Sequence, residues 1–206
     1  MENGRPKWIR PIGNTPHGGV PNHLAKSFRL LKIIEIEVTE RKPENHQSEN
    51  VIFNEKYIRT VKDYDKNQFA NLCDNERLIL GNSGKAISRE SIRDLNHSLL
   101  LVSPTRFEVT QRAYENRPGK PQTRLVFTYN DNSYDFPITD PVFLDLHKRN
   151  ADFLKQTKQI YLTLSLGLEW ESWYYKLVAA ITRIQDLPDS RTLKSPLQFF
   201  KQFFGN

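Results

Sequence analysis

Residues 160–168 alternate between apolar and polar side chains. The apolar positions are Ile160, Leu162, Leu164, Leu166 and Leu168. A period of two is typical of a β-strand with one buried face. After a short connection that carries Trp170 and Trp173, residues 174–181 predict a second strand. The pair predicts a core built from β-sheet, with aromatic rings on its loops.

A second pair of alternating segments predicts a β-hairpin. Residues 124–129 and 134–138 lie on either side of Asn130-Asp-Asn-Ser133, whose composition is typical of a turn. Further strands are expected at residues 8–12, 31–38 and 107–114, and the apolar triplet at residues 51–53 is expected to be buried. Pro11 restricts the first of these to a sheet edge or a strand end. The chain is therefore rich in β segments along most of its length.

Three segments have helical spacing instead. One apolar stripe consists of Tyr64, Phe69, Leu72 and Cys73. Another, with Ser88 as the N-cap, consists of Ile92, Leu95 and Leu99. A third helix is expected to begin with Asp140 as N-cap and Pro141 at the first helical position. Its buried stripe is Phe143, Leu146, Phe153 and Leu154. This order has no regular β-α-β repeat, which argues against a doubly wound parallel sheet.

The length and composition allow a compact core. A chain of 206 residues can hold one large domain or two small ones, and 37% hydrophobic with 11% aromatic residues is not the composition of a disordered chain. The predicted fold is mainly β with a few helices (α+β), arranged as small barrels or as a sandwich. Two five-stranded barrels of about 100 residues each would fit the length. Periodicity alone leaves both architectures open.

Basic residues exceed acidic ones by 30 to 24, which gives a net charge of +6. This excess favours anionic partners. One basic group precedes Ile33 and consists of Arg5, Lys7, Arg10, Lys26, Arg29 and Lys32. A second surrounds a loop with proline and glycine and consists of Arg112, Arg117, Lys120 and Arg124. These side chains are expected either to contact phosphates or to remain solvated surface charges.

Cys73 is the only cysteine, so neither an internal disulfide nor a structural zinc site is expected. A single thiol is compatible with a reducing cytoplasm. No apolar run reaches the roughly 18 residues of a membrane helix. Lys7 and Arg10 lie where a signal peptide would be apolar. We therefore expect a soluble cytoplasmic protein with no metal and no cofactor.

Several short motifs follow one another along the chain. They are Trp8-Ile-Arg-Pro-Ile12, His46-Gln-Ser-Glu-Asn50, Thr139-Asp-Pro141, Leu164-Ser-Leu-Gly167 and Tyr175-Lys-Leu-Val-Ala-Ala-Ile181. Their order resembles that of the dual-OB (DuOB) domain proteins of bacteria. The resemblance implies two OB-like barrels packed in tandem and no established catalytic centre. It also implies recognition of nucleic acid or nucleotides, often in bacterial conflict systems.

The expected organisation has three parts. Residues 1–103 form an N-terminal OB-like barrel with helices, residues 104–184 a C-terminal OB-like barrel, and residues 185–206 a tail. Two features depart from the family. Another strand usually precedes the Trp8 motif, and a proline commonly stands at the position of Ser48. An N-terminal barrel without its first strand would expose a sheet edge or take a strand from a partner protein.

Binding of nucleic acid requires cations that follow phosphates and flat rings on which bases stack. The residues expected to serve this purpose are Lys7, Trp8, Arg10, His46, Gln47, Asn50, Trp170, Trp173, Tyr174 and Lys176. Trp8 and Arg10 share one strand face, and so do Tyr174 and Lys176. Each group has an alternative role. Trp8 can be a core ring, residues 46–50 can form a turn, and the aromatic residues near 170 can plug the end of a barrel.

No catalytic site is expected. The chain has no P-loop, nucleophile elbow, dinucleotide fingerprint or His-Glu-x-x-His motif. Its five histidines are dispersed. The Glu40-Arg-Lys42 segment has the spacing of many nuclease motifs, but the strand before it offers only Glu35 and Glu37 at close range. The sequence thus favours binding over catalysis.

The tail predicts a short amphipathic helix that binds a protein partner. Ser195 and Gln198 form a capping box around Pro196. The apolar residues are Leu197, Phe199, Phe200, Phe203 and Phe204. Because so short a helix is marginal alone, it is expected to pack on its own domain or in a groove of another protein.

The expected function is therefore a non-catalytic nucleic-acid-binding module. Its ligand would be single-stranded RNA or DNA, and it would act within a bacterial defence complex. The alternative is an adaptor subunit of a multi-protein complex that does not contact nucleic acid.

Overall fold

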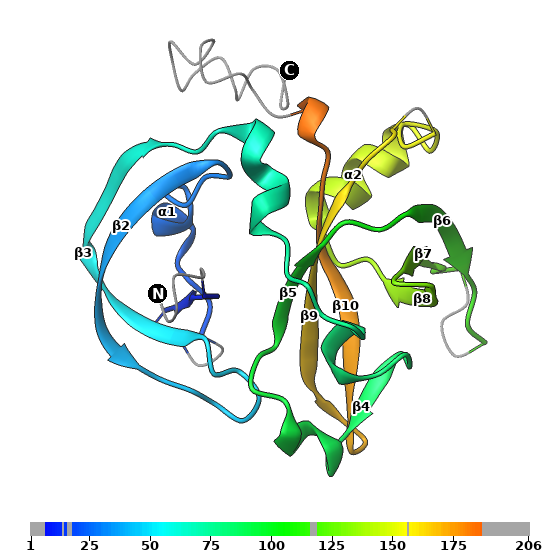
Figure 1. Ribbon diagram of the computed structural model, residues 1–206, viewed down its shortest axis with the longest axis horizontal. Coiled ribbons are helices and arrows are strands. Elements are labelled where there is room, and N and C mark those ends of the chain that lie inside the picture. Colours follow the sequence, from blue (N-terminus) through cyan, green and yellow to red (C-terminus); the bar gives the residue numbers. More distant parts are fainter. Residues whose placement is uncertain (1–6, 14, 16–17, 116–118, 156, 187–206) are drawn as a thin grey trace.

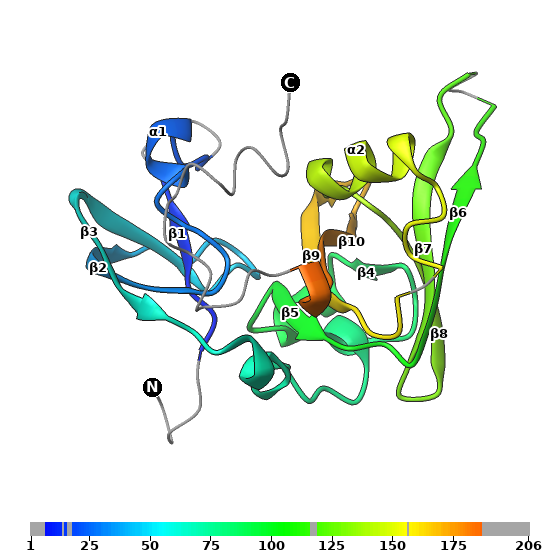
Figure 2. The ribbon, with the colours of Figure 1, turned by 90° about the horizontal axis from the view of Figure 1, so that it is seen from above.

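The computed structural model describes residues 7–13, 15, 18–115, 119–155 and 157–186 (Figure 1). These residues form ten strands in three sheets, with two short α-helices and several 3₁₀ turns between them. The predicted class, mainly β with a few helices, is confirmed. The N-terminal and C-terminal halves lie side by side in both views (Figures 1 and 2). The tail residues predicted to bind a partner lie outside the described residues, as do Arg5 and Arg117.

Strand pairing closes the C-terminal half into a barrel. Its first strand is bent and consists of β5 (Leu99–Val102) and β6 (Arg106–Arg112). The other strands are β7 (Gln122–Tyr129), β8 (Asn132–Pro137), β9 (Tyr161–Trp170) and β10 (Trp173–Thr182). Antiparallel ladders join β6 to β7, β7 to β8, β10 to β9, and β9 to β5. A parallel bridge between Ile138 and Val178 joins the end of β8 to β10. This is the order of a five-stranded Greek-key OB barrel.

The predicted alternation along β9 fills this barrel. Ile160, Leu162 and Leu164 are fully buried, and Leu166 is 2% exposed. Aromatic rings from the facing sheet meet them, with the centroids of Phe127 and Phe136 5.5 Å apart in an edge-on contact. Such dense apolar packing is the main source of stability for a domain of this size.

The prediction that Leu168 continues the buried row was wrong, because this side chain is 78% exposed. The cause is a bulge in the β9–β10 ladder. Leu166 pairs with Lys176, but Glu169 pairs with Tyr174, so β9 has one extra residue between these pairs. An extra residue exchanges the inward and outward sides of the strand. Beyond the bulge, Leu168 and Trp170 therefore point away from the barrel interior.

The helix α2 (Pro141–Arg149) follows β8 and begins at the predicted N-cap. The Oδ1 atom of Asp140 accepts hydrogen bonds from the backbone N–H groups of Val142 and Phe143, at 3.0 and 3.1 Å. Its Oδ2 atom accepts a third bond, at 3.0 Å, from the backbone N–H of Ile181 in β10. One carboxylate thus caps the helix and ties it to the barrel.

Replacement of Asp140 by alanine is expected to lower the free energy of unfolding by about 2 kcal/mol. The cap alone contributes about 1 kcal/mol, and the orphaned N–H of Ile181 adds a similar amount. Urea denaturation followed by tryptophan fluorescence measures the change. Asp145→Ala, on the exposed side of the same helix, is the control and should change stability by less than about 0.5 kcal/mol. Equal effects of the two substitutions would contradict the double role of Asp140.

The N-terminal half is a half-barrel of three strands. Its order is β1 (Arg10–Ile12), β3 (Asn50–Asp63) and β2 (Lys32–Arg41). The short helix α1 (Asn22–Ala25), none of whose residues is buried, lies between β1 and β2 along the chain. β1 pairs only with β3, in parallel, which agrees with the edge position predicted from Pro11. β2 forms the opposite edge, and no other strand among the described ranges pairs with it.

The helix predicted after Ser88 was largely wrong. Only a 3₁₀ turn, Ser91–Asp94, forms there, and Leu99 begins β5. Residues 99–102 are all apolar and pair with β9, so burial in the sheet overrides the weak helical spacing. The helix predicted at residues 64–73 is present as a 3₁₀ helix, Lys66–Leu72, capped by Asp65.

The strand pairing also bears on the expected domain boundary at residues 103 and 104. β4 (Ala86–Ser88) pairs with β10, and β5 pairs with β9. Both strands precede the expected boundary but lie in the C-terminal sheet. The sheet of the C-terminal barrel therefore includes β4 and β5.

A small apolar cluster joins the two halves. Phe69, Leu101 and Tyr161 form its buried centre, and Trp8 packs against it. The indole Nε1 of Trp8 donates a 2.9 Å hydrogen bond to Asp74, whose same oxygen accepts the backbone N–H of Leu101 at 2.7 Å. Trp8 therefore anchors the N-terminal strand on the C-terminal barrel.

Candidate ligand-binding face

The outer wall of the C-terminal barrel carries a pocket of about 510 Å³. Six of the residues that line it come from the end of β6 and the residues just after it, from β7 and from the β9–β10 hairpin. They are Arg112, Tyr114, Gln122, Arg124, Trp170 and Tyr175. OB barrels bind oligonucleotides and oligosaccharides on the face of their second and third strands. Two loops border this face, one between strands one and two and one between strands four and five. β7 and β8 are the second and third strands here, so the pocket lies on the face that binds ligands in this fold.

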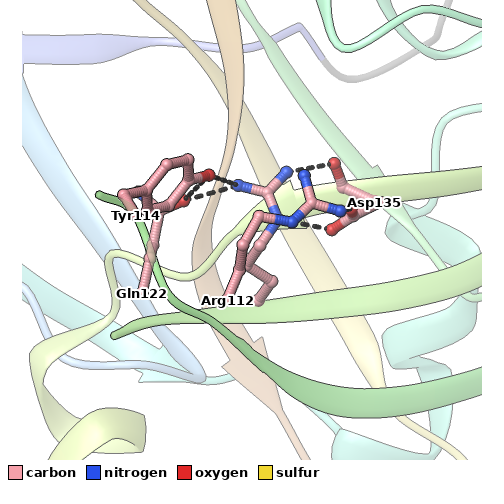
Figure 3. Close-up of polar contacts among 5 residues, drawn as sticks. Arg112, Tyr114, Gln122 and Asp135 are labelled. Carbon is pink, nitrogen blue, oxygen red and sulfur yellow. Dashed lines mark hydrogen bonds and ion pairs between the residues drawn. The ribbon is translucent and has the colours of Figure 1, made fainter. Parts of the chain in front are cut away.

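Two arginines on this face share one carboxylate. The Nε of Arg124 lies 2.6 Å from Oδ1 of Asp135, and an Nη of Arg112 lies 2.6 Å from Oδ2 (Figure 3). The two guanidinium groups differ in exposure, because the side chain of Arg112 is 50% exposed and that of Arg124 only 6%. One positive charge therefore exceeds the negative charge at this point, and Arg112 carries it toward solvent.

Arg124 holds the surrounding polar groups in place. Besides Asp135, it donates to the side-chain oxygen of Gln122 at 2.5 Å and to the hydroxyl of Tyr114 at 3.4 Å. The hydroxyl of Tyr114 donates in turn to Gln122 at 3.1 Å (Figure 3). This network fixes the ring of Tyr114 at the rim of the pocket. A preorganised ring loses little conformational entropy when a ligand stacks on it.

The tip of the β9–β10 hairpin presents the two tryptophans singled out from the sequence. Trp170 and Trp173 pair directly across the ladder and are 66% and 45% exposed. Directly opposed residues project on the same side of a sheet, so the two indoles form one surface next to the pocket. Glu171 and Ser172 make the turn between them, both with positive φ.

The other two residues of that predicted platform lie inside the barrel. Tyr174 is 5% exposed and donates from its hydroxyl to Glu169 at 2.9 Å. Lys176 is fully buried, and its Nζ donates to the carbonyl oxygens of Ile79 and Asn82 and to the Asn82 side chain, at 2.6, 2.7 and 2.9 Å. Tyr174 and Lys176 do share a face, as predicted, but that face points inward.

The N-terminal candidates lie where the two halves meet. Trp8 bonds to Asp74, as described above, and Arg10 donates to Ser98 at 2.8 Å and lies 3.2 Å from the carboxylate of Glu49. Burial lowers the pKa of Arg10, and the charge of Glu49 opposes this effect. Lys7 is exposed. Trp8 and Arg10 are thus engaged in contacts within the protein.

His46, Gln47 and Asn50 lie in and beside a tight turn. The backbone N–H of Gln47 donates to the carbonyl of Glu44 at 2.8 Å, and the Asn50 amide donates to the Gln47 side chain at 3.1 Å. His46 is 3% exposed, and its ring meets that of Tyr174 edge-on with centroids 4.7 Å apart. The alternative role of these residues as a turn agrees with these contacts.

Sequence reasoning missed part of this face. Arg112 and Arg124 were recognised as basic residues around a loop but not as site residues, and Tyr114 and Asp135 were not singled out. A signal was present, because Arg124 and Asp135 lie on the outward side of two strands whose alternation was read correctly. Only the register places their charges next to each other.

The described ranges contain no cluster of three histidine, cysteine, aspartate or glutamate side chains that could hold a metal ion. Nor does any helix there have the length and apolar character of a membrane span. The chemistry that the face does offer is cationic and aromatic. Such groups bind anions and flat rings.

Comparisons with known proteins agree with the geometry. A family model described as "Dual OB-containing domain" matches residues 1–181. No match was found among the curated proteins or among the solved structures. The matched region includes the half-barrel, the C-terminal barrel and the pocket on its outer wall. The chain therefore belongs to the dual OB-containing domain (DuOB) family and is an OB-type binding module.

Proposed function

We propose that the protein binds single-stranded RNA or DNA on the outer wall of its C-terminal barrel and performs no catalysis. The observation that carries this proposal is the meeting of Arg112, Tyr114 and Trp170 at one pocket on the ligand-binding face of an OB barrel. Cations and exposed rings at a groove are what proteins use to bind single strands.

The solvent exposure of each side chain indicates its role in the proposed site. Arg112 can exchange its contact with Asp135 for a phosphate oxygen, since half of its side chain is already in solvent. Trp170 and Trp173 offer apolar faces on which successive bases stack. Arg124, in contrast, is a positioning residue, because its guanidinium group already donates hydrogen bonds to Asp135, Gln122 and Tyr114.

Replacement of Arg112 by alanine is expected to weaken binding of a fluorescent single-stranded oligonucleotide. The logarithm of the binding constant should also depend less steeply on the logarithm of salt concentration, by about 0.7, because one phosphate contact is lost. Fluorescence anisotropy over a series of salt concentrations measures both quantities.

Arg149→Ala is the matched control for this experiment. Arg149 is exposed to a similar degree, 59% against 50%, and also pairs with an aspartate, but it lies on α2 and does not line the pocket. The proposal is refuted if the wild-type protein fails to bind RNA and DNA strands at low salt. If the binding constants of the two variants depend equally steeply on salt concentration, Arg112 does not contact a phosphate of the strand.

The cellular setting belongs to the same proposal. The resemblance to DuOB proteins supports a role inside a bacterial defence complex, and the single thiol of Cys73 is compatible with the cytoplasm. We further propose a protein partner. The outer edge of β2, with which no strand of the described residues pairs, favours it, since such an edge can accept a strand from another protein.

An adaptor without nucleic-acid contact is the second candidate. The outer edge of β2 favours it as well, and so does the exposed apolar surface of Leu168, Trp170 and Trp173. The oligonucleotide measurement separates the two candidates, because an adaptor would show no salt-dependent binding.

A further inference from the structure

A second pocket, which we call the junction pocket, lies between the half-barrel and the C-terminal barrel and has a volume of about 510 Å³. Its lining includes His46, Arg89, Arg93, Glu169 and Tyr174. It shares no lining residue with the pocket on the outer wall. A site here would therefore act separately from the proposed strand-binding face.

The charge of the junction pocket favours an anion. Arg89 and Arg93 lie on the segment between β4 and β5, and Glu169 is the only carboxylate among the lining residues. Arg89 and Glu169 approach each other loosely, with 3.4 Å between Nε and Oε1. Within the described part of the chain, Arg93 forms no ion pair. Two guanidinium groups against one carboxylate leave one positive charge in excess, and guanidinium groups bind phosphate through paired hydrogen bonds.

A buried and unpartnered histidine borders the same space. The turn at residues 44–47, in which Asn45 has a φ of 51°, places His46 against Tyr174 with only 3% of the residue exposed. Neither ring nitrogen of His46 has a hydrogen-bond partner in the structure. Buried polar groups are almost always satisfied. Both nitrogens are closed off in this structure, so a ligand would reach them through a turn of the ring toward the pocket that His46 lines.

Burial, together with two neighbouring charges, shifts the pKa of this ring. Burial lowers the pKa of His46 and the charge of Arg10 lowers it further, whereas the charge of Glu49 raises it. A neutral imidazole donates through one nitrogen only. His46 therefore contributes a hydrogen bond, and the arginines contribute the positive charge.

The volume of the junction pocket and its other lining residues indicate what the ligand carries besides a phosphate. Ile92 and Leu95 also line the pocket and give it an apolar side, and the volume lies within the usual range for sites of drug-sized molecules, about 300 to 1,000 Å³. A phosphate ion alone would leave most of this space unfilled. A planar ring would pack against the ring edges of His46 and Tyr174. Hydroxyl groups of the ligand would donate hydrogen bonds to the carboxylate of Glu169.

We propose that the junction pocket binds a small phosphomonoester that carries a planar ring, the chemistry of a nucleoside monophosphate. Its phosphate contacts Arg89 and Arg93, and its ring packs beside Ile92, Leu95 and the two buried aromatic side chains. Because turn residues of the half-barrel and strand residues of the barrel both line the site, the ligand also bridges the two halves.

Isothermal titration calorimetry of the full chain with AMP, adenosine and inorganic phosphate tests this proposal. AMP is expected to bind at least about tenfold more tightly than adenosine, since a charged hydrogen-bonded contact contributes about 1.5 to 3 kcal/mol. Arg93→Ala should weaken AMP binding by a similar factor, and Arg149→Ala should leave it unchanged. The Trp170→Ala/Trp173→Ala double variant should also keep full AMP affinity, which separates this site from the strand-binding face.

A phosphomonoester can come from a free nucleotide or from the end of a strand. Trinucleotides with a 5′-phosphate or a 5′-hydroxyl distinguish these sources. If the 5′-phosphate raises the affinity of the trinucleotide and Arg93→Ala abolishes this increase, the ligand is the end of a strand. If the 5′-phosphate does not raise the affinity and AMP still binds, the ligand is a free nucleotide. The proposal is overturned if wild-type protein shows no saturable AMP binding or if Arg93→Ala binds AMP as tightly as wild type.

Discussion

Replacing both Trp170 and Trp173 by alanine is expected to weaken the binding of a single-stranded oligonucleotide by about 30-fold to 10,000-fold. Stacking of a base on an aromatic side chain contributes about 1 to 3 kcal/mol, so the loss of two indoles costs about 2 to 6 kcal/mol. Fluorescence anisotropy at one low salt concentration measures the change. The salt slope should stay close to that of the wild type, because indoles make no phosphate contact.

The folded state should tolerate this double substitution, because 66% of Trp170 and 45% of Trp173 is exposed. Thermal unfolding provides that check. Tyr57→Ala, which removes a 42% exposed ring from β3 in the N-terminal half, is the aromatic control and should bind the oligonucleotide normally. Unchanged binding by the tryptophan variant would exclude the hairpin tip as a stacking surface.

The stability of the protein is expected to rise by about 2 kcal/mol between pH 7 and pH 9 because of Lys176. Burial lowers the pKa of this lysine from 10.5 to about 7. In the unfolded chain it stays protonated across this range, whereas in the folded protein it loses its proton. The unfolded state therefore binds more protons, and the free energy of unfolding increases with pH by up to about 1.4 kcal/mol per unit. About one pH unit below 7 and lower, both states are protonated, and this contribution no longer changes.

Urea denaturation at half-unit pH intervals measures the slope, and Lys176→Met provides the comparison. The variant should lack the increase, since methionine does not titrate. The window ends at pH 9 because burial also raises the pKa of Cys73 from 9.0 to about 11, which lowers stability as pH rises further. A wild-type stability that does not increase from pH 7 to pH 9 would show that the ammonium keeps its proton on its three acceptor oxygens.

Much of the fold could be predicted from local pattern. The alternation at residues 124–138 predicted β7, the turn and β8, and Asp140 with Pro141 predicted the start of α2. These features depend on neighbouring residues only, through side-chain period, turn composition and capping. The helix expected after Ser88 failed for the opposite reason, since pairing of Leu99 with distant Ser165 decided its conformation.

The candidate site could be predicted only in part. Trp170 and Trp173 were identified as rings on a loop, and the structure places them beside the pocket. Tyr174 and Lys176 were correctly assigned to a common side of their strand, but strand parity says nothing about whether that side faces solvent or core. Arg112, Arg124 and Asp135 come from three strands, and only their register brings the three charges together.

Side-chain period was enough to determine that the chain forms sheet, where most strands lie, and which residues share a face. Long-range pairing was needed to determine which way the β9–β10 hairpin presents its residues. The extra residue between Leu166 and Glu169 turns Trp170 outward while Tyr174 and Lys176 stay inside. This bulge depends on hydrogen bonds between two strands, and the apolar alternation of β9 continues through it to Leu168, so the period of the sequence does not reveal it. For that reason the ring surface, the arginine pair and the junction pocket all became visible only in the assembled barrel.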